Sequence, residues 1–313
     1  MTKGKYIISI MGPTGVGKTE LAIELSKLLN SFLISVDSVQ VYKGLDIGSG
    51  KLSKKKLLTY PHKLIDISDP IIPYSVAKFN KDVWEVINEI HLKNKVPILV
   101  GGTMLYFNSL IKGLTSLPNA DSKLRKELTE KARLKGWPKM HQELSKIDPQ
   151  AAAKIHMNDS QRIQRALEIN LLTGLTINKL KDKESISPNS DLKLLQFAIQ
   201  PNSRESLRSS LEQRFLGMLD NGFIDEVEQL IKARGMIKDL PSMRSVGYRQ
   251  IWEYLDGNLS NQEMILRSVN ATRQLAKRQM TWLRSWEGII WLPQFIPDAV
   301  QLILQTLDEK DLI

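Results

Sequence analysis

A phosphate-loop signature close to the N-terminus is the feature that most restricts the fold of this chain. Gly12-Pro-Thr-Gly-Val-Gly-Lys-Thr19 matches the pattern GxxxxGK[ST], directly after an apolar, β-prone run at 6–11 and at the start of a predicted helix at 18–29. Glycines in such a loop let successive backbone N–H groups face one phosphate, and the helix N-terminus adds its positive dipole end. The motif therefore predicts a strand, a phosphate-binding loop and a helix, and its ligand is a diphosphate or a nucleotide.

The order of apolar runs and helical segments after this loop indicates an α/β fold. Further strands are predicted at 32–36, 63–67 and 96–100, with a helix at 76–92 before the last of them. Strands that alternate with helices form parallel sheets with right-handed crossovers. We therefore expect a phosphate-loop core like that of the P-loop NTPases, in which a parallel sheet is flanked by helices.

The middle of the chain has a different pattern, which is helical only. Asp121 and Asp159 are candidate N-caps of helices that stop at Gly136 and Gly174. A polar stretch at 181–191 predicts a loop, and an apolar run at 192–199 predicts a return to the sheet. The expected organisation is a core at 1–119 and 191–313 that includes the C-terminal helices, with a helical insertion domain at 120–190.

The clearest helix of the last third begins at Ser260, which with Glu263 has the spacing of a capping box. Its apolar positions fall on one face, and cations lie beside that face or further round the helix. The apolar face comprises Ile265, Val269, Thr272, Ala276, Met280 and Leu283, and the cations are Arg267, Arg273, Lys277, Arg278 and Arg284.

Positive charge is unevenly distributed along the chain. The 313 residues carry 44 Lys and Arg against 34 Asp and Glu, a net charge of +10. The excess lies in 1–120, 121–184 and 244–284, whereas 185–243 is nearly neutral and 285–313 is acidic. Segregated cations favour a polyanionic partner such as nucleic acid, and solvated helix surfaces are the alternative explanation.

Several classes of protein and of site are excluded by what the sequence lacks. There is no cysteine, so disulfides, thiolate zinc sites and cysteine nucleophiles are excluded. The four histidines have no metal-ligand spacing, and no HExxH or Ser/His/Asp pattern occurs. No apolar run approaches the roughly 18 to 20 residues that span a bilayer, and the first ten residues are too short for a signal-peptide core. We expect a cytoplasmic protein without membrane contact.

Polar side chains follow two predicted strands at the point where each strand ends. Asp37 comes after the strand at 32–36, beside the phosphate loop in a parallel sheet. It is a candidate metal-holding carboxylate of a hydrolase, a candidate general base of a transferase, or a cap of the next turn; Asp66 is a weaker candidate for the same roles. Gly101-Gly102-Thr103 follows the strand at 96–100 and either admits a large planar group beside Thr103 or forms a tight turn in which Thr103 caps a helix.

Taken together, these segments resemble the bacterial tRNA dimethylallyltransferases, also called isopentenyl-diphosphate:tRNA isopentenyltransferases, over essentially the whole chain. The segments that carry the resemblance are the phosphate loop, SVDSVQVYKGLDIG at 35–48, PHKLIDISDP at 61–70, VGGTMLYF at 100–107, NDSQR at 158–162, EQRF at 212–215, VGYRQ at 246–250 and TRQLAKRQMTWLR at 272–284. Two departures are visible: Val39 stands where a longer or polar residue is common, and Ser49-Gly50-Lys51-Leu52 replaces the usual Thr-Ala-Lys-Pro.

The resemblance implies transfer of a dimethylallyl group from dimethylallyl diphosphate to N6 of adenosine 37, 3′ of the anticodon, in tRNAs that read codons beginning with U, which gives N6-isopentenyladenosine. Asp37 would accept the proton of the amine and Thr103 would orient the amine, which makes these two the expected catalytic residues. The partners implied are a tRNA anticodon stem-loop, dimethylallyl diphosphate and Mg²⁺, and the protein is expected to be a monomer. Mg²⁺ would bind the hydroxyl of Thr19.

The same resemblance implies two sets of binding residues. The expected diphosphate-binding set is Gly12, Pro13, Thr14, Gly15, Val16, Gly17, Lys18, Thr19 and Arg214. The expected tRNA-binding set is Asp37, Ser38, Val39, Gln40, Thr103, Arg125, Gln161, Arg162, Ile163, Gln164, Arg165, Arg244, Ser245, Val246, Gly247, Tyr248, Arg249, Lys277, Arg278, Gln279 and Arg284, among which Ile163 and Val246 are expected to serve in packing. A small-molecule kinase and an RNA-binding ATPase remain the alternatives, because both share a phosphate loop.

Overall fold

The structure is a computed structural model that describes residues 5–114, 117–183, 193–234 and 236–312. It divides into two compact units, one formed by 1–111 with 189–313 and the other by 112–188. The first unit contains the sheet and the phosphate loop, and the second is helical.

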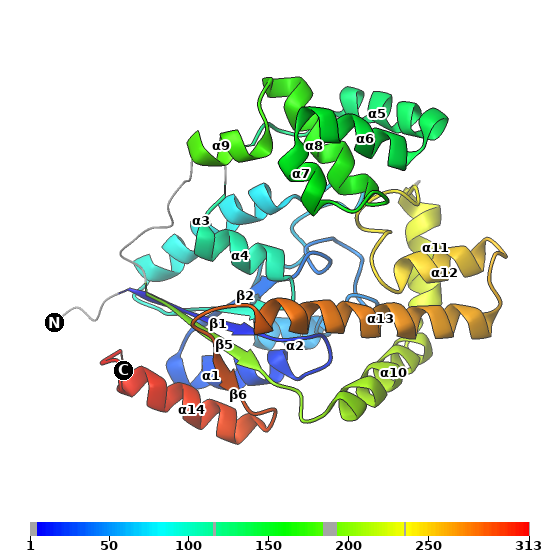
Figure 1. Cartoon of the computed structure of the whole chain (residues 1–313). Helices are drawn as coiled ribbons and strands as arrows, with labels where there is room; N and C mark the ends of the chain where they lie inside the picture. The colour runs from blue at the N-terminus through cyan, green and yellow to red at the C-terminus, as the bar shows by residue number, and fades with distance from the viewer. Residues whose placement is uncertain (1–4, 115–116, 184–192, 235, 313) are drawn as a thin grey trace. The chain divides into compact units, whose positions relative to one another are not determined.

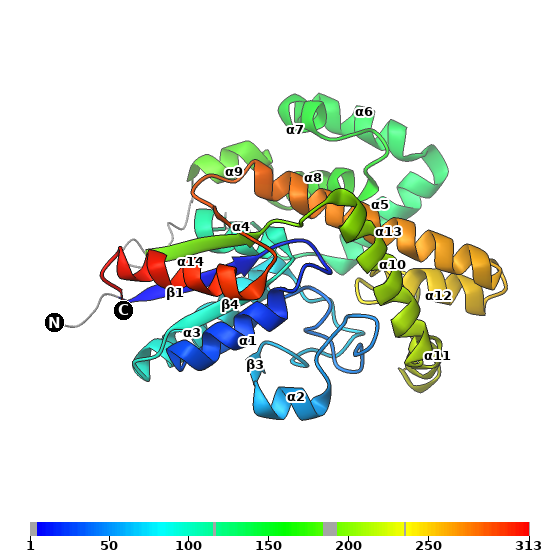
Figure 2. The same ribbon diagram turned by 90° about the horizontal axis from the view of Figure 1, so that it is seen from below.

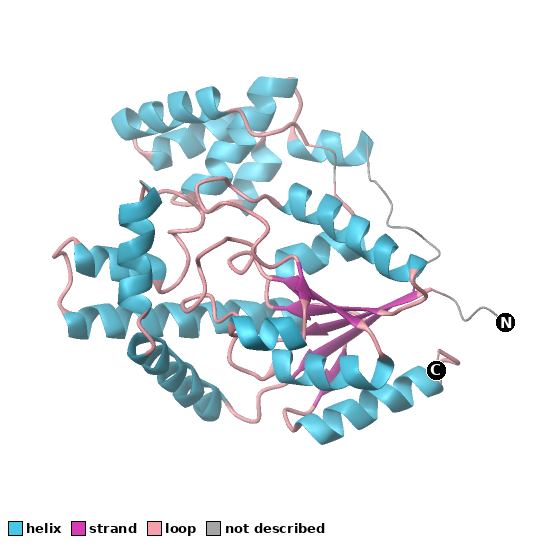
Figure 3. Cartoon of the chain, turned by 180° about the vertical axis from the view of Figure 1, so that it is seen from behind, coloured by secondary structure: helices cyan, strands magenta, loops and turns pink. Residues whose placement is uncertain are grey.

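Six strands among the described residues form one sheet in which all strands are parallel (Figure 3). The strand order is β3-β2-β4-β1-β5-β6, so the chain leaves central β1 toward β2 on one side and later adds β5 on the other. Ligands of open parallel sheets bind at the carboxyl ends of strands where the order switches in this way. The strands are β1 (Tyr6–Met11), β2 (Phe32–Val36), β3 (His62–Lys63), β4 (Pro97–Gly101), β5 (Lys193–Ile199) and β6 (Ile290–Leu292).

Alternate side chains of β1 enter two different hydrophobic cores, because successive residues of a strand point to opposite faces of the sheet. Tyr6, Ile8 and Ile10 pack in one core, with α1 (Lys18–Leu29) and α14 (Ile296–Asp308). Ile7 and Met11 pack in the other, with α3 (Val76–Leu92) and α4 (Met104–Lys112). Figure 1 shows these helix pairs on opposite faces of the sheet, and Figure 2 shows α1 and α14 side by side.

The first unit has five further helices among its described residues, and four of them, all except α2, contribute side chains to the core that contains α3 and α4. They are α2 (Lys54–Thr59), α10 (Arg204–Asp220), α11 (Phe223–Arg234), α12 (Tyr248–Leu255) and α13 (Asn261–Arg284). Ser260 and Glu263 form the predicted capping box at the start of α13. The predicted apolar face of α13 is buried or half-buried at every position.

The described residues of the second unit form five helices around a small core of its own. They are α5 (Ser122–Lys135), α6 (Trp137–Ile147), α7 (Pro149–Lys154), α8 (Ser160–Thr173) and α9 (Ile177–Lys183). Asp121 and Asp159 cap α5 and α8 as predicted, since each side chain accepts a hydrogen bond from a first-turn backbone N–H, and Gly136 and Gly174 follow the last residues of these helices. Leu128, Met140, Leu144 and Ile163 are among the side chains that form the core.

Most predicted elements begin and end within a residue of their predicted bounds, with two exceptions. The strand predicted at 63–67 is confined to His62–Lys63, because Leu64 and Asp66 adopt left-handed φ of 65° and 57°, which strands do not accommodate. The loop predicted at 181–191 begins in helix α9, which extends to Lys183, and its remainder lies outside the described residues. None of the described helices is long and apolar enough to cross a membrane.

Candidate active site

The phosphate loop connects β1 to α1 in the conformation that its glycines predict. Gly15 and Gly17 have φ of 79° and 90°, in the left-handed region, and Gly17 is the N-cap of α1. A Cβ atom on Gly15 would lie 2.8 Å from the side chain of Leu211, so α10 packs directly against the loop. The loop thus lies at the positive end of α1, where anions bind.

Lys18 is the first residue of α1 and turns back over the loop. Its Nζ donates a hydrogen bond of 2.6 Å to the carbonyl of Pro13. Burial lowers the pKa of Lys18 to about 8. The negative charge of Asp37 acts against this shift, and the positive charge of Arg214 adds to it. An anionic ligand beside Lys18 would favour the charged form of the ammonium group and would offset the cost of burying that charge.

Arg214 extends from α10 into the same region as Lys18. Among the described residues, no hydrogen bond or ion pair engages its guanidinium group, and partial burial lowers its pKa. A Cβ atom on Gly50 would lie 1.8 Å from Nη2 of Arg214, so the guanidinium group packs against a bare backbone. Two cations without a carboxylate partner, Lys18 and Arg214, therefore face the region of the phosphate loop, as an anion site requires.

Asp37 and Thr103 lie together where β2 and β4 end. The hydroxyl of Thr103 accepts a hydrogen bond of 3.0 Å from the N–H of Ser38, the residue after Asp37. One carboxylate oxygen of Asp37, Oδ1, accepts hydrogen bonds from the N–H groups of Val39 (2.8 Å) and Gln40 (3.1 Å). Asp37 therefore caps the turn, which is one of the predicted alternatives, and no hydrogen bond from the described residues engages its Oδ2 atom.

The glycines that follow β4 have close neighbours of their own. A Cβ atom on Gly101 would lie 2.0 Å from the carbonyl oxygen of Val36, the paired residue of β2. A Cβ atom on Gly102 would lie 2.4 Å from Nε2 of Gln279. The side-chain amide of Gln279 therefore lies against Gly102, and the hydroxyl of Thr103 accepts a hydrogen bond from the N–H of Ser38. The predicted approach of a planar ligand group beside Thr103 stays a prediction.

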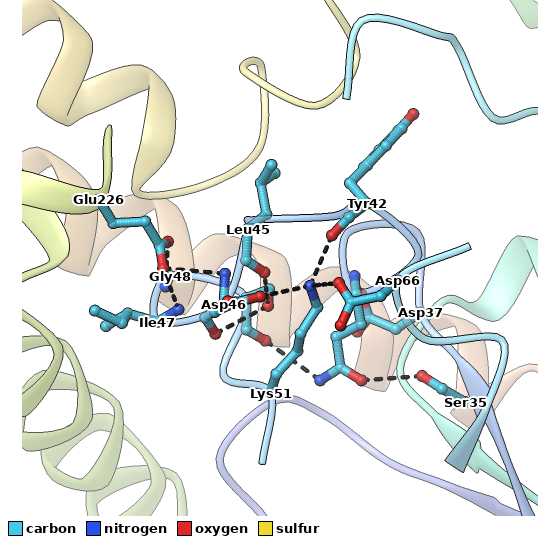
Figure 4. Close-up of polar contacts among 12 residues, drawn as sticks. Ser35, Asp37, Tyr42, Leu45, Asp46, Ile47, Gly48, Lys51, Asp66 and Glu226 are labelled. Atoms are coloured by element: carbon cyan, nitrogen blue, oxygen red, sulfur yellow. Dashed lines mark hydrogen bonds and ion pairs between the residues drawn. The ribbon is translucent and has the colours of Figure 1, made fainter. Parts of the chain in front are cut away.

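The segment after Asp37 is fixed by two charged side chains (Figure 4). Glu226 of α11 accepts hydrogen bonds from three successive backbone N–H groups, those of Asp46 (3.0 Å), Ile47 (2.6 Å) and Gly48 (3.2 Å). It also accepts one from the hydroxyl of Tyr248. These hydrogen bonds connect the segment at 46–48 to α11 through Glu226, and to α12 through Tyr248.

Lys51, which follows this segment in the chain, also binds it. Its side chain is 2% exposed and donates to the carbonyl of Tyr42 (2.6 Å), to Asp46 (2.8 Å) and to Asp66 (2.6 Å). Asp66 is thus one of two carboxylates paired with Lys51. Asp66, the weaker alternative to Asp37, is therefore held in an ion pair with Lys51.

A cavity of about 550 Å³ brings these groups together within the first unit. Its lining includes residues 14–19 of the phosphate loop, Asp37, Gln40 and Arg214. Apolar side chains complete it, among them Val39, Val100, Leu211, Phe215 and Met218. The cavity is large enough for a small organic diphosphate and offers cations for the phosphates and an apolar wall for a hydrocarbon group.

The residues of the cavity also fit the Mg²⁺ ion that the phosphate loop implies. Thr19 lines the cavity and offers a hydroxyl oxygen, the kind of ligand that Mg²⁺ prefers. In the described parts of the chain, no group of three or more His, Cys, Asp or Glu side chains could hold a metal on its own. Such a donor set suits an ion that arrives with the phosphates, because Mg²⁺ commonly combines one or two protein oxygens with phosphate oxygens and water.

The predicted tRNA-binding residues of the first unit differ in how far their side chains are exposed. Arg244, Arg249, Lys277, Arg278 and Arg284 are exposed on or beside α12 and α13. Tyr248 is completely buried, and burial followed by the charge of Glu226 raises its pKa. Gln279 is also buried. The side chains of Tyr248 and Gln279 are turned into the protein. Their predicted part in tRNA binding is therefore limited to backbone contacts or to an indirect effect.

In the second unit, two of the predicted RNA contacts, Arg125 and Arg165, share one buried carboxylate. Glu168 is 0% exposed and accepts both a bidentate pair of hydrogen bonds from Arg125 (2.8 and 3.0 Å) and one from Arg165 (2.6 Å). Burial alone would raise the pKa of Glu168, but these hydrogen bonds and one from the N–H of Asp121 hold it below its usual range. Ile163 lies in the core, as its expected packing role requires.

Sequence reasoning did not identify Glu226, Glu168 or Lys51, which organise these regions. Glu226 binds amides 178 to 180 residues away and Glu168 binds Arg125, 43 residues away, whereas Lys51 binds partners within 15 residues. A buried acid carries no periodic signal that separates it from a solvated one. The sequence does contain a signal for Gly50, because this residue belongs to the visible departure at 49–52.

The chain matches a protein-family model described as IPP transferase over residues 40–286. This range is more than half of the chain and includes the second unit and all of α13.

Solved structures of similar proteins extend the match to nearly the whole chain. A tRNA isopentenylpyrophosphate transferase from Bacillus halodurans is 37% identical, with 98% of each chain covered and a TM-score of 0.71. A tRNA delta(2)-isopentenylpyrophosphate transferase from Staphylococcus epidermidis is 31% identical over 97% of this chain and 99% of that one, with a TM-score of 0.70. A eukaryotic dimethylallyltransferase that acts on tRNA is 27% identical over 98% of this chain and 80% of that one, with a TM-score of 0.80.

Proposed function

The chain belongs to the IPP transferase family and is a tRNA prenyltransferase, and we propose that it transfers a dimethylallyl group from dimethylallyl diphosphate to N6 of adenosine 37 of tRNA, which gives N6-isopentenyladenosine. The family assignment confirms the resemblance found in the sequence. The proposal extends to the anticodon stem-loop as the part of the tRNA that is bound, and to a monomer as the active form.

The observation that carries the proposal is that one cavity holds an anion site and a free carboxylate oxygen together. The phosphate loop, Lys18 and Arg214 supply the anion site, and Asp37 supplies the carboxylate. A hydrolase or kinase can also place a carboxylate beside its anion site. The apolar wall of the cavity and the IPP transferase match favour transfer of a hydrocarbon group to an amine, for which the carboxylate serves as the base.

In the proposed reaction, the N6 nitrogen attacks the allylic carbon C1 while the C1–O bond breaks, and the diphosphate leaves with the bonding electron pair. The N6 amine is a weak nucleophile, because its lone pair is delocalised into the purine. Oδ2 of Asp37 accepts the proton that the nitrogen loses, and Thr103, beside it, orients the amine. Lys18, Arg214 and the amides of the phosphate loop stabilise the negative charge of the leaving diphosphate. Thr19 would hold Mg²⁺ together with the phosphates, and the ion would further neutralise this charge.

The exposed cations have a role in the same proposal. A base in an anticodon loop must leave its stack to enter a cavity, which costs a few kcal/mol that contacts to the RNA backbone offset. The exposed side chains proposed to bind phosphates are Arg244, Arg249, Lys277, Arg278 and Arg284 of the first unit and Arg162 of the second. Arg125 and Arg165, which are half-buried and paired with Glu168, are proposed to bind phosphates through the part of each side chain that stays exposed.

Nucleoside mass spectrometry tests the proposal directly. Unmodified tRNA is incubated with the protein, Mg²⁺ and dimethylallyl diphosphate, beside a reaction that contains ATP in place of the prenyl donor. We expect a new isopentenyladenosine peak that depends on the prenyl donor and is lost when adenosine 37 is replaced. Absence of this peak with folded protein, together with hydrolysis of ATP, would instead support a kinase or an RNA-binding ATPase.

A further inference from the structure

Gln279 has an unusual position for a residue in the most cationic stretch of α13. Its neighbours Lys277 and Arg278 are exposed, whereas the Gln279 side chain is 8% exposed. Its Oε1 atom accepts a hydrogen bond of 2.9 Å from the N–H of Thr14 in the phosphate loop. Its Nε2 atom donates a hydrogen bond of 2.7 Å to the carbonyl of Gly102, where β4 ends.

Gly102 is shaped to receive this amide. A Cβ atom at position 102 would lie 2.4 Å from Nε2 of Gln279 and 3.5 Å from the carbonyl oxygen of Gly12. Only a residue without a side chain leaves room for the amide between the phosphate loop and the end of β4. Gln279 thus fills the gap between the loop and the strand end that continues into Thr103.

We propose that Gln279 is a positioning residue that sets the spacing between the phosphate loop and the Gly102–Thr103 strand end, and so between the prenyl donor and the acceptor amine. The inference rests on the proposed function. The donor is held by the loop and the amine by Asp37 and Thr103, so this spacing is the distance that the transfer must cross. A misplacement of about 1 Å can cost about 10²-fold in rate.

The polarity of the two hydrogen bonds explains why the residue is a glutamine. The N–H of Thr14 needs an acceptor and the carbonyl of Gly102 needs a donor, and a neutral amide provides both. A glutamate of the same size would keep the bond to Thr14 but would place a carboxylate oxygen against the Gly102 carbonyl. A leucine of similar volume would leave both backbone groups without a partner.

Steady-state kinetics of Gln279→Glu and Gln279→Leu test this role, with Gln262→Glu and Gln262→Leu as controls. Gln262 lies on the same helix and is exposed, and no hydrogen bond of its side chain occurs within the described residues. We expect Gln279→Leu to raise the KM for dimethylallyl diphosphate and to lower kcat, each by about tenfold, because two buried backbone groups lose their partners. The Kd for tRNA, measured by filter binding, should stay within about twofold, and the Gln262 variants should match the parent protein.

Other results would overturn the inference in recognisable ways. A weaker Kd for tRNA with an unchanged KM for the prenyl donor would make Gln279 a direct RNA contact instead. Unchanged kinetics in both Gln279 variants would exclude a positioning role. If Gln279→Leu does not fold, Gly102→Ala displaces the same amide from the other side and should produce the same change in KM and kcat. Failure of the parent protein to transfer the prenyl group would contradict the proposed function, whereas a fully active Gln279→Leu variant contradicts only this inference.

Discussion

The guanidinium group of Arg214 occupies the space in which a Cβ atom of residue 50 would lie, 1.8 Å from its Nη2 atom. Gly50 also has a φ of +66°, in the left-handed region. We therefore predict that Gly50→Ala displaces Arg214 from the anion site and raises the KM for dimethylallyl diphosphate about tenfold, as expected when one charged hydrogen-bond donor to a phosphate is lost. Steady-state kinetics at saturating tRNA measure this change.

Two further variants separate the displacement of Arg214 from backbone strain. In an Arg214→Ala background, Gly50→Ala should change the KM no further, since no guanidinium group is left to displace. Gly257 has a similar φ of +75° with nothing within 4 Å of its Cβ position. Gly257→Ala should therefore cost about 1 kcal/mol of stability, as left-handed backbone does in a residue with a side chain, and leave the KM unchanged. An unaltered KM in Gly50→Ala would show that Arg214 does not need this space.

The depressed pKa of Lys18, about 8, predicts a loss of donor binding at alkaline pH. Below pH 8 the ammonium group is charged and binds the diphosphate; as the pH rises through 8 the group loses its proton, and binding must then include proton uptake. Calorimetric titration of dimethylallyl diphosphate in buffers of different ionisation enthalpy should show little proton uptake at pH 6.5 to 7 and nearly one proton at pH 9. Lys18→Arg should bind without this uptake, because arginine does not titrate in that range. An equal uptake in both proteins would assign the titration to another group.

Asp37→Asn tests the separation of the two carboxylate oxygens. The amide oxygen can still accept hydrogen bonds from Val39 and Gln40, so the turn should persist, but the base is lost. We predict that kcat falls by about 10² to 10⁴, the range of general acid–base catalysis, while thermal stability and the Kd for dimethylallyl diphosphate change little. Asp66→Asn is the control, because Asp66 binds Lys51 instead. Transfer at the parent rate in Asp37→Asn would exclude Asp37 as the base.

Local signals predicted most of the fold and the central part of the site. The GxxxxGK[ST] pattern, the apolar runs and the caps at Asp121, Asp159 and Ser260 are short-range features, and the elements they predict occur at those places. The carboxyl ends of β2 and β4 meet because the sheet is parallel, and this brings Asp37 and Thr103 together, as the resemblance implied.

The side-chain contacts that organise the site were not predictable in the same way. Gln279 binds a loop 265 residues earlier in the chain, and Glu226 binds amides 178 to 180 residues away. On a helical wheel, Gln279 lies next to the apolar face of α13, where polarity alone suggests a solvated residue. Gln279 can turn inward because Gly102 leaves space for its amide. The local sequence of α13 contains no sign of that space.

Glu226→Gln should loosen the segment at 46–48 that three of its hydrogen bonds hold. An amide at this place presents an NH₂ group to backbone N–H donors, so we predict a loss of about 1 to 3 kcal/mol in the free energy of unfolding, the cost of unsatisfied buried groups. Urea unfolding followed by circular dichroism measures it. Glu228→Gln on the same helix removes an exposed i,i+4 pair with Lys232 and should cost no more than about 0.5 kcal/mol. Equal losses in both variants would contradict the role assigned to Glu226.

Glu168→Gln should destabilise the second unit, because it leaves Arg125 and Arg165 without their shared carboxylate. Removal of one partner from a buried ion pair costs about 3 to 5 kcal/mol, and the partial exposure of both arginines places the expected loss at or below the lower end of that range. The lowered pKa of Glu168 gives this loss a pH dependence. The stabilisation is complete above the unfolded-state pKa, near 4.5, and disappears as the pH falls through the lower folded-state pKa. The parent protein should therefore lose its advantage over Glu168→Gln between neutral pH and strongly acidic pH, and a difference in melting temperature that does not change with pH would exclude the ionised carboxylate as its cause.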